Sequence, residues 1–330
     1  MSKVKELDYL GNLDIGDKFS GVYYVEDSFI RKTVQGKDFM DITLRDKTGS
    51  RKAKFWGVVP GIKKGDFALA SGAVEDYRGN PSFVLANLES VDEPSDLSDY
   101  LPVYADADNL VDRMDVLRES LNKAAEKADL QIVGEIVDAV YGNGAFFNKL
   151  VTVPGSLAPH YGCQSGLLAN VVRVGETAIQ MASNYGLKPD EEVLVYAGAM
   201  LCMIGGVDAY GFENCMPVLT TNGQLLGVTN LTMIRVSTAA KRASAERSKA
   251  KTLKDTDGGI IGRLLHVIAA SLNYGDEPVR PMTKEAIVVA NAVRSDMEIV
   301  ASLNFIENDQ NGDSEFTAYD PVLRRRYFKG

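Results

Sequence analysis

A period of two residues runs through Lys37-Asp38-Phe39-Met40-Asp41-Ile42-Thr43-Leu44-Arg45. Successive side chains of a β-strand point to opposite faces of its sheet. The alternation therefore assigns two faces to this stretch, with Met40, Ile42 and Leu44 inward and Phe39, Asp41, Thr43 and Arg45 outward. It predicts a strand with one face on a core and the other in solvent.

A second strand is expected after the turn residues Asp46-Lys47-Thr48-Gly49. In Arg51-Lys52-Ala53-Lys54-Phe55-Trp56 the same alternation places Ala53 and Phe55 inward. A tight turn at Thr48-Gly49 makes the two strands neighbours in a hairpin. One solvent face is therefore expected to carry Phe39, Arg45, Lys52, Lys54 and Trp56.

The β pattern extends from Asp17 to about Val91, and turn signals such as Lys64-Gly65-Asp66 interrupt it. About five strands fit, a number suited to a small closed barrel. Residues 92–105, rich in Asp, Pro and Ser, are expected to form a linker. Helical periodicity then predicts helices over 106–126, 129–141, 163–186, 189–204, 228–250, 257–273 and 282–304. The chain is therefore expected to be an α+β protein with a β domain over 1–91 and a helical domain over 106–330.

Composition narrows the class of protein. The chain has 330 residues, of which 45% are hydrophobic and 25% charged, as in globular proteins. No secretory signal or membrane-spanning run is visible, so we expect a cytoplasmic protein with no membrane partner. Three cysteines (Cys163, Cys202 and Cys215) cannot form a disulfide framework, and their spacing, with only two histidines, argues against a zinc site. No cofactor is expected.

The charge is unevenly distributed. The whole chain carries −9, but residues 30–80 hold eleven Lys or Arg against six Asp or Glu, which is +5, so the remainder carries −14. A basic module on an acidic body is typical of local phosphate binding.

Flat rings stack on bases and cations follow phosphates, so this module suits sequence-tolerant binding of single strands. We expect Phe39, Trp56 and Tyr77 to stack, and Lys37, Arg45, Lys52, Lys54 and Arg78 to contact phosphates. The alternative is structural, because exposed lysines also keep strands from aggregating and a single Trp can pack under a loop.

The chain resembles the YhaM-type 3′–5′ exoribonucleases, in which an OB-fold domain precedes a helical HD-superfamily phosphohydrolase domain. The resemblance rests in the first domain on Phe19-Ser20-Gly21-Val22-Tyr23, on 36–49 and on Ala53-Lys54-Phe55-Trp56. In the second domain it rests on Ala158-Pro159-His160, Gly166-Leu167-Leu168, Tyr196-Ala197-Gly198, 223–227 and 281–286. The resemblance implies a five-stranded OB-fold barrel followed by an all-α HD-like domain.

The metal positions of that family depart from its pattern. HD enzymes bind divalent cations through imidazoles and carboxylates, which activate water. The family's metal ligands, and the lysine near them, correspond in this sequence to Ala169-Asn170, Cys202-Met203, Gly206, Val228 and Val293. Of the family's histidines, only the one at His160 is present. Asp208 and Asp296 are scattered carboxylates. The resemblance thus implies no catalytic residues, no metal and no HD hydrolysis.

Three further features stay open. A shifted metal site on Asp208, Glu213 and Cys215 is weighed against a solvated loop over 207–216. A basic segment over 235–254 either contacts phosphate or is a solvated face. The basic tail 324–329 either docks on the body or guides a strand.

The leading hypothesis is a catalytically inactive YhaM-like protein that binds single-stranded RNA or DNA through its OB-fold. Its helical domain would be an assembly or docking scaffold for a protein partner from a replication, transcription or RNA-decay machine. The alternatives are an active 3′–5′ exonuclease with a non-standard metal site and a protein-interaction pseudo-enzyme. Homo-oligomer formation and a phage origin are left open.

Overall fold

The computed structural model describes residues 7–77, 79–104, 106–158, 161–272, 279–307, 309 and 314–330. The chain divides into two compact units. The first extends to Val103 and includes Glu213–Met216, and the second comprises Tyr104–Phe212 and Pro217–Gly330. Most of the segment expected as a linker is therefore grouped with the first unit.

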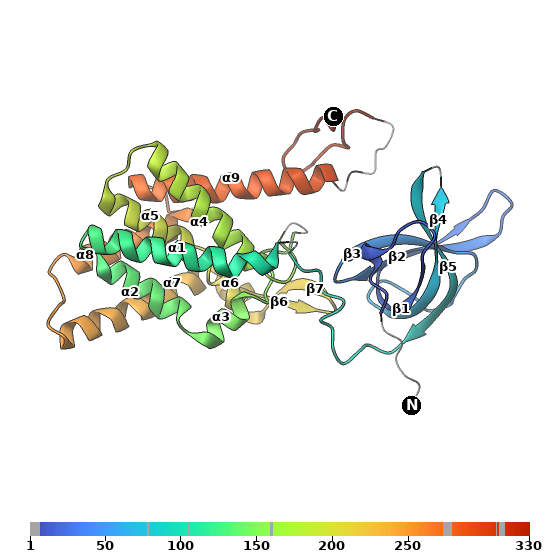
Figure 1. Ribbon diagram of the computed structural model, residues 1–330, viewed down its shortest axis with the longest axis horizontal. Coiled ribbons are helices and arrows are strands. Elements are labelled where there is room, and N and C mark those ends of the chain that lie inside the picture. Colours follow the sequence, from blue (N-terminus) through green and yellow to red (C-terminus); the bar gives the residue numbers. More distant parts are fainter. Residues whose placement is uncertain are drawn as a thin grey trace. The chain divides into compact units, whose positions relative to one another are not determined.

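The first unit contains a closed barrel with strand order β1-β2-β3-β5-β4 (Figure 1). Its strands are β1 (Lys18–Lys32), β2 (Asp38–Asp46), β3 (Gly49–Phe55), β4 (Phe67–Tyr77) and β5 (Asn80–Val91). Neighbouring strands are antiparallel except β3 and β5, which are parallel. A 3-10 helix, η1 (Leu10–Asn12), precedes them. The predicted five-stranded OB-like barrel is confirmed.

The barrel core is formed by the residues that alternation placed inward. Met40, Ile42 and Leu44 of β2 are buried, as is Ala53 of β3, while Phe55 is half-buried against the same core. They pack with apolar side chains from the other strands, among them Phe19, Tyr23, Val25, Ala70, Val74, Phe83 and Leu85. Burial of these side chains stabilises the closed sheet at about 25 cal/mol per Å² of apolar surface.

A bulge changes the alternation within β1. Val25 pairs with Leu44, but the next pair along the ladder joins Asp27 to Thr43, so one extra residue lies in β1 between them. An extra residue in one strand shifts every later side chain to the opposite face. The end of β1 therefore follows a different alternation from its beginning.

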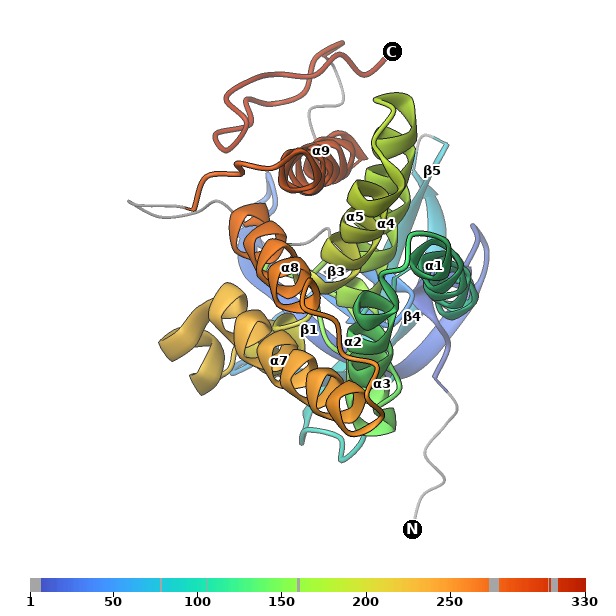
Figure 2. The same ribbon diagram turned by 90° about the vertical axis from the view of Figure 1, so that its left-hand side faces the viewer.

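The second unit is helical. Its helices are α1 (Ala107–Lys127), α2 (Gln131–Tyr141), α3 (Gly144–Leu150), α4 (Gly166–Asn184), α5 (Pro189–Leu201), α6 (Gly206–Ala209), α7 (Thr221–Lys249), α8 (Asp257–Ser271) and α9 (Lys284–Glu307). Helix α5 contacts α1, α2, α4, α8 and α9 and is the central helix of this unit (Figure 2). The stretch Pro189–Ala209 is long and apolar enough to cross a membrane. However, 83% of its most apolar 18-residue segment is buried inside the protein.

Differences from the sequence prediction lie at short elements and at one kink. Helices α3 and α6 and the hairpin of β6 (Tyr210–Glu213) and β7 (Met216–Leu219) were not predicted. Helix α7 was expected to begin at 228, but it begins at Thr221, because the Thr220 hydroxyl accepts a hydrogen bond from the Gly223 amide at 3.0 Å. Gly227 has a φ of 70° and kinks the helix just before the predicted start.

Candidate functional site

Antiparallel pairing assembles one solvent-facing surface on the barrel, here called the outer face. It consists of Phe29 and Arg31 of β1, Phe39, Asp41 and Thr43 of β2, Lys52 and Lys54 of β3, and Trp56 just after β3. The register places Arg31 opposite Phe39, Asp41 opposite Lys54, and Thr43 opposite Lys52. Residues opposite each other in a ladder share a face, so the outer face is continuous across three strands.

Two aromatic rings lie together on the outer face. The ring centroids of Phe39 and Trp56 are 5.3 Å apart and the planes are tilted by 40°. Trp56 is 62% exposed, and Phe39 is half-buried beneath the surface. Such a pair offers an exposed aromatic surface on which a planar base can stack.

A cation and a further aromatic residue lie in the same region. Lys54 is exposed, and its Nζ lies 5.9 Å from the ring centroid of Tyr77, which is 60% exposed at the end of β4. Lys52 and Lys37 are also exposed, Lys52 opposite Thr43 and Lys37 just before β2. Arg78, the remaining cation predicted here, lies outside the described residues. The structure thus groups Phe39, Trp56, Lys54 and Tyr77.

The exposure predicted for Arg45 is wrong, although the side chain does point away from the barrel core. Its side chain is buried, and its Nη1 donates to Glu26 Oε1 at 3.1 Å while its Nη2 donates to the carbonyl oxygen of Cys215. Its guanidinium carbon lies 4.4 Å from the ring centroid of Tyr24. Cys215, from a distant part of the chain, covers this end of β2, so alternation along the strand no longer reports exposure. Arg45 therefore links β1 to Cys215 within the first unit, and its side chain is not part of the outer face.

Phe29 and Arg31 were missed by reasoning from the sequence. Alternation from the buried residues Tyr23 and Val25 would send both inward, and the bulge between Val25 and Asp27 reverses this. Phe29 is exposed, and Arg31 forms an ion pair with Asp41 at 3.1 Å between Nε and Oδ2. Asp27 and Ser28 beside the bulge are residue types common in turns, but this part of β1 contains no glycine or proline that would mark the bulge in the sequence.

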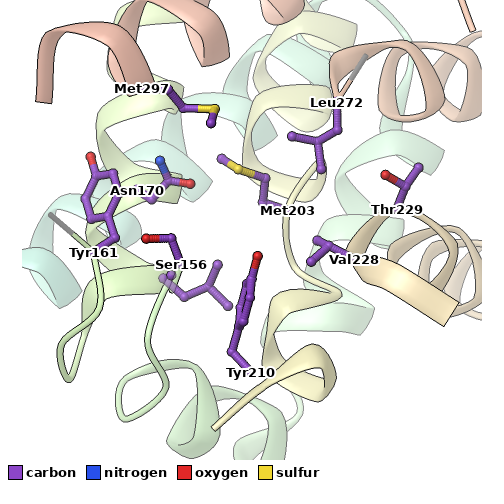
Figure 3. A pocket seen from close by; sticks show the side chains of 11 residues that line it. Ser156, Tyr161, Asn170, Met203, Tyr210, Val228, Thr229, Leu272 and Met297 are labelled. Atoms are coloured by element: carbon purple, nitrogen blue, oxygen red, sulfur yellow. The ribbon is translucent and has the colours of Figure 1, made fainter. Parts of the chain in front are cut away.

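The second unit contains a cavity of about 330 Å³. Figure 3 shows its lining side chains. They come from the loop before α4, from α4, from the segments on either side of α6, from α7, from the residue after α8 and from the middle of α9. The lining residues are Gly155, Ser156, Tyr161, Leu167, Asn170, Met203, Tyr210, Val228, Thr229, Leu272 and Met297. Three of them, Asn170, Met203 and Val228, stand where the resemblance placed metal ligands. Residues far apart in the sequence thus converge on one cavity.

A buried carboxylate lies behind the cavity wall. Asp296 Oδ2 accepts hydrogen bonds from the Tyr161 hydroxyl at 2.8 Å and from Asn170 Nδ2 at 3.0 Å. Asp296 Oδ1 accepts from Arg173 Nε at 3.0 Å, which also neutralises its charge. Burial raises the pKa of Tyr161 well above its usual range, and the charge of Asp296 adds to this shift, so the phenol remains a donor.

The described residues do not fit the divalent metals of an HD enzyme. None of the described lining side chains is a carboxylate, imidazole or thiol, and the oxygens of Asp296 already accept from three donors. Cys202 is fully buried, and burial raises the pKa of its thiol to about 12, so it is a neutral thiol at physiological pH. Across the part of the chain that the structure describes, no three His, Cys, Asp or Glu side chains cluster as metal ligands would. His160 lies outside that part.

Among the described residues, Asp208, Glu213 and Cys215 are not part of a cluster of three His, Cys, Asp or Glu side chains that could hold a metal ion. Asp208 belongs to the second unit, where it pairs with Arg235 and, at 3.6 Å, with Lys149. Glu213 and Cys215 belong to the first unit, where Cys215 is buried against Tyr24. The solvated loop expected over 207–216 is also wrong, because this stretch contains parts of α6, β6 and β7.

Much of the remaining basic charge is paired. In the segment over 235–254, Arg247 pairs with Glu135 at 2.8 Å and Lys249 with Glu246 at 2.9 Å. In the tail, Arg325 pairs with Glu298 of α9 at 2.6 Å. Each of these ion pairs reduces the attraction of its cation for phosphate. The outer face is the candidate nucleic-acid interface because it combines exposed rings with exposed lysines.

The curated proteins that match this sequence and are described here all carry the same name. No family model matches the chain. Proteins named 3′-5′ exoribonuclease YhaM match it at 24% identity from Bacillus velezensis, 23% from Listeria innocua and 25% from a Geobacillus species. The matches cover 96%, 91% and 89% of this chain and 95%, 89% and 86% of the relatives.

Among the solved structures that resemble part of the chain is a single-domain OB-fold. It is the second OB-fold domain of replication protein A from Methanococcus maripaludis, at 19% identity and a TM-score of 0.22. The alignment covers 27% of this chain and 98% of that domain. The resemblance stated from the sequence is confirmed: over nearly its whole length, and at low identity, the chain is homologous to proteins named 3′-5′ exoribonuclease YhaM.

Proposed function

We propose that this protein is a catalytically inactive relative of the YhaM exoribonucleases that binds single-stranded RNA or DNA through the outer face of its barrel. The observation that carries the proposal is the Phe39–Trp56 ring pair beside Lys54 and Tyr77. Stacking on such rings contributes about 1–3 kcal/mol per base, and it is tolerant of sequence because every base has a flat face.

The outer face can attract a single strand in two ways, by stacking on bases and by attracting phosphates. Trp56 and Tyr77 provide exposed rings, and Lys52 and Lys54 provide exposed cations at alternate positions of β3. Alternate residues of a strand lie about 7 Å apart, a distance similar to the phosphate spacing of an extended single strand. A strand running along β3 would therefore meet a cation at successive phosphates.

Catalytic inactivity is supported by the chemistry of the cavity in the second unit. Hydrolysis of a phosphodiester by an HD enzyme requires metal ligands that converge on a water molecule. The corresponding positions here carry an amide (Asn170), a thioether (Met203) and an isopropyl group (Val228). None of these side chains is a hard anionic ligand for Mg²⁺ or Mn²⁺.

Binding is tested by anisotropy titration of labelled single-stranded RNA and DNA oligomers at two salt concentrations. We expect micromolar or tighter affinity that falls steeply with salt, and loss of binding when Trp56→Ala and Lys54→Ala are combined. The matched control is Tyr185→Ala, which removes an exposed aromatic side chain from the second unit. Undetectable or salt-insensitive binding would overturn the proposal.

An active exonuclease is the second candidate, because the relatives named above are exoribonucleases. The test is incubation of 5′-labelled RNA and DNA with pure protein and Mn²⁺ or Mg²⁺. We expect full-length oligomer to remain. Shortening that disappears in the His160→Ala or Asp208→Asn variant would establish a nuclease with a non-standard site.

The second unit is proposed as the assembly or docking scaffold, with a protein of a replication, transcription or RNA-decay machine as its partner. Light scattering of the pure chain tests self-association, and co-purification from cells with a Trp56→Ala control separates protein partners from those bridged by nucleic acid. Recovery of a partner only with the intact outer face would argue against a docking role for the helices.

A further inference from the structure

The cavity of the second unit has the size of a small-molecule site. Its volume of about 330 Å³ falls at the lower end of the range, roughly 300–1,000 Å³, that such sites occupy. Its walls come from the helical core, since Leu167 and Met203 are buried core residues and Val228 and Thr229 are half-buried on α7. The site is therefore built on packed helices, whose positions are fixed by the surrounding core.

Most of the wall is apolar and polarizable. Met297 lines the cavity from α9 and Met203 from the turn between α5 and α6 (Figure 3). Val228 and Leu272 close it from another side. Thioether sulfurs make favourable contacts with aromatic rings and adapt to their shape. The ring of Tyr210 also points into this space. Such a wall selects a flat aromatic molecule.

One polar group in the wall has a fixed orientation. Asn170 is 3% exposed, and its Nδ2 donates to Asp296. An ionised carboxylate only accepts hydrogen bonds, so the amide must present its NH2 group to Asp296. The carbonyl oxygen of Asn170 is therefore directed toward the cavity, as Figure 3 shows. This oxygen is an acceptor for a ligand N–H or O–H group.

The lining carries no formal charge among the described residues. The nearby carboxylate of Asp296 is neutralised by Arg173. An ionised ligand group placed here would lose its hydration without gaining an opposite charge, which is strongly unfavourable. The site should therefore prefer neutral ligands over their anionic counterparts.

From these observations we infer that the cavity binds a small, uncharged heteroaromatic compound, whose ring lies between Met203 and Met297 and whose N–H group donates to the Asn170 carbonyl oxygen. This inference does not depend on strand binding by the barrel, because every residue that carries it belongs to the second unit.

The test is calorimetric titration of the full-length protein with two neutral probes, indole and adenosine, and with their anionic counterparts, indole-3-acetate and adenosine 5′-monophosphate. We expect at least one neutral probe to bind one to one with a dissociation constant of about 1 mM or lower. Its anionic counterpart should bind at least about tenfold more weakly. Absence of binding by both neutral probes, or equal binding by the anions, would overturn the inference.

The location is tested by variants that fill the cavity. Val228→Phe and Thr229→Phe should each weaken the binding of the neutral probe about tenfold or more, and Leu225→Phe, at an exposed position of the same helix, should leave it unchanged. Trp56→Ala should also leave it unchanged, which distinguishes this site from the outer face. Unaltered binding in both filling variants would exclude the cavity.

A measurement on the unsubstituted protein covers the case in which a filling variant does not fold. With methyl-labelled methionine, the NMR signals of Met203 and Met297 should shift on addition of the neutral probe. The signal of Met114, a core residue that does not line the cavity, should not. Shifts at Met114 alone, or at no methionine, would contradict the inference.

Discussion

The rings of Phe39 and Trp56 lie 5.3 Å apart on the outer face of the barrel, with the more deeply placed phenyl ring supporting the exposed indole. Trp56 is the single tryptophan of the chain. Its fluorescence therefore reports on this face alone, which makes the proposed interface directly observable.

A single-stranded oligomer should quench the fluorescence of Trp56 on binding. Phe39→Ala should weaken binding about threefold to tenfold, because the indole loses the ring that orients it, which is less than the loss of a full stacking partner. Fluorescence titration with unlabelled RNA checks both points. Tyr185→Ala should leave the titration unchanged, and a titration that leaves the Trp56 signal constant would place the strand elsewhere.

Asp41 is the negative charge on the outer face, and it lies opposite Lys54 and pairs with Arg31. Asp41→Asn should therefore increase the affinity for single-stranded RNA by roughly twofold to fivefold at low salt, because Arg31 is released and phosphate repulsion is removed. Lys52→Ala should have the opposite effect and reduce the slope of log affinity against log salt by about 0.7. Anisotropy titrations over a salt series measure both, with Lys123→Ala in the second unit as the control.

Arg45 should matter for stability and not for binding. Arg45→Met removes the hydrogen bonds to Glu26 and Cys215, so we expect the free energy of unfolding to fall by about 2–3 kcal/mol. Arg51→Met, a substitution at a less buried position of the same sheet, should change it by less than about 0.5 kcal/mol. Chemical denaturation compares the two variants. If the folded Arg45→Met variant binds RNA more weakly than the unsubstituted protein, Arg45 contributes to the nucleic-acid interface and the prediction is wrong.

Asp296 is expected to have a structural role. Asp296→Asn removes the ion pair with Arg173. It also replaces one acceptor oxygen of the network around Tyr161 by a donor NH2 group. The free energy of unfolding should therefore fall by about 2–4 kcal/mol. Thermal denaturation measures this loss, and RNA binding by the folded variant should be unaltered. A fall in RNA cleavage with no change in stability would instead identify Asp296 as part of a working site.

The buried thiols predict a pH dependence at the alkaline end. Burial raises the pKa of Cys202 to about 12 and that of Cys163 to about 11, from an ordinary value of 9.0. An acid whose folded pKa is raised contributes stability that is complete below its unfolded pKa and is lost as pH rises through its folded pKa. The free energy of unfolding should therefore fall between about pH 9 and pH 12, and Cys202→Ala should reduce that slope. Buried Tyr141, whose pKa burial also raises, acts in the same direction and should leave a residual slope.

Much of the fold could be predicted from local patterns. Alternation in 37–45 and 51–56 identified two strands of the barrel and the inward side chains Met40, Ile42 and Ala53. Helical periodicity located α1, α2, α4, α5, α8 and α9 to within a few residues. The strand period and the helix period both follow from the geometry of a single element and the burial of one of its faces. Each period can therefore be recognised in a short stretch of sequence.

The tertiary structure decided what depends on contacts between distant segments. Arg45 is buried because Cys215, 170 residues away, covers it, and Phe29 and Arg31 reach the outer face because a bulge in β1 is set by pairing with β2. Asn170, Met203 and Val228 line one cavity only because tertiary folding brings α4, the turn between α5 and α6, and α7 to the same place. The sequence alone determined which side chains each strand and helix offers; long-range packing, which no local period encodes, determined which of them meet and which stay in solvent.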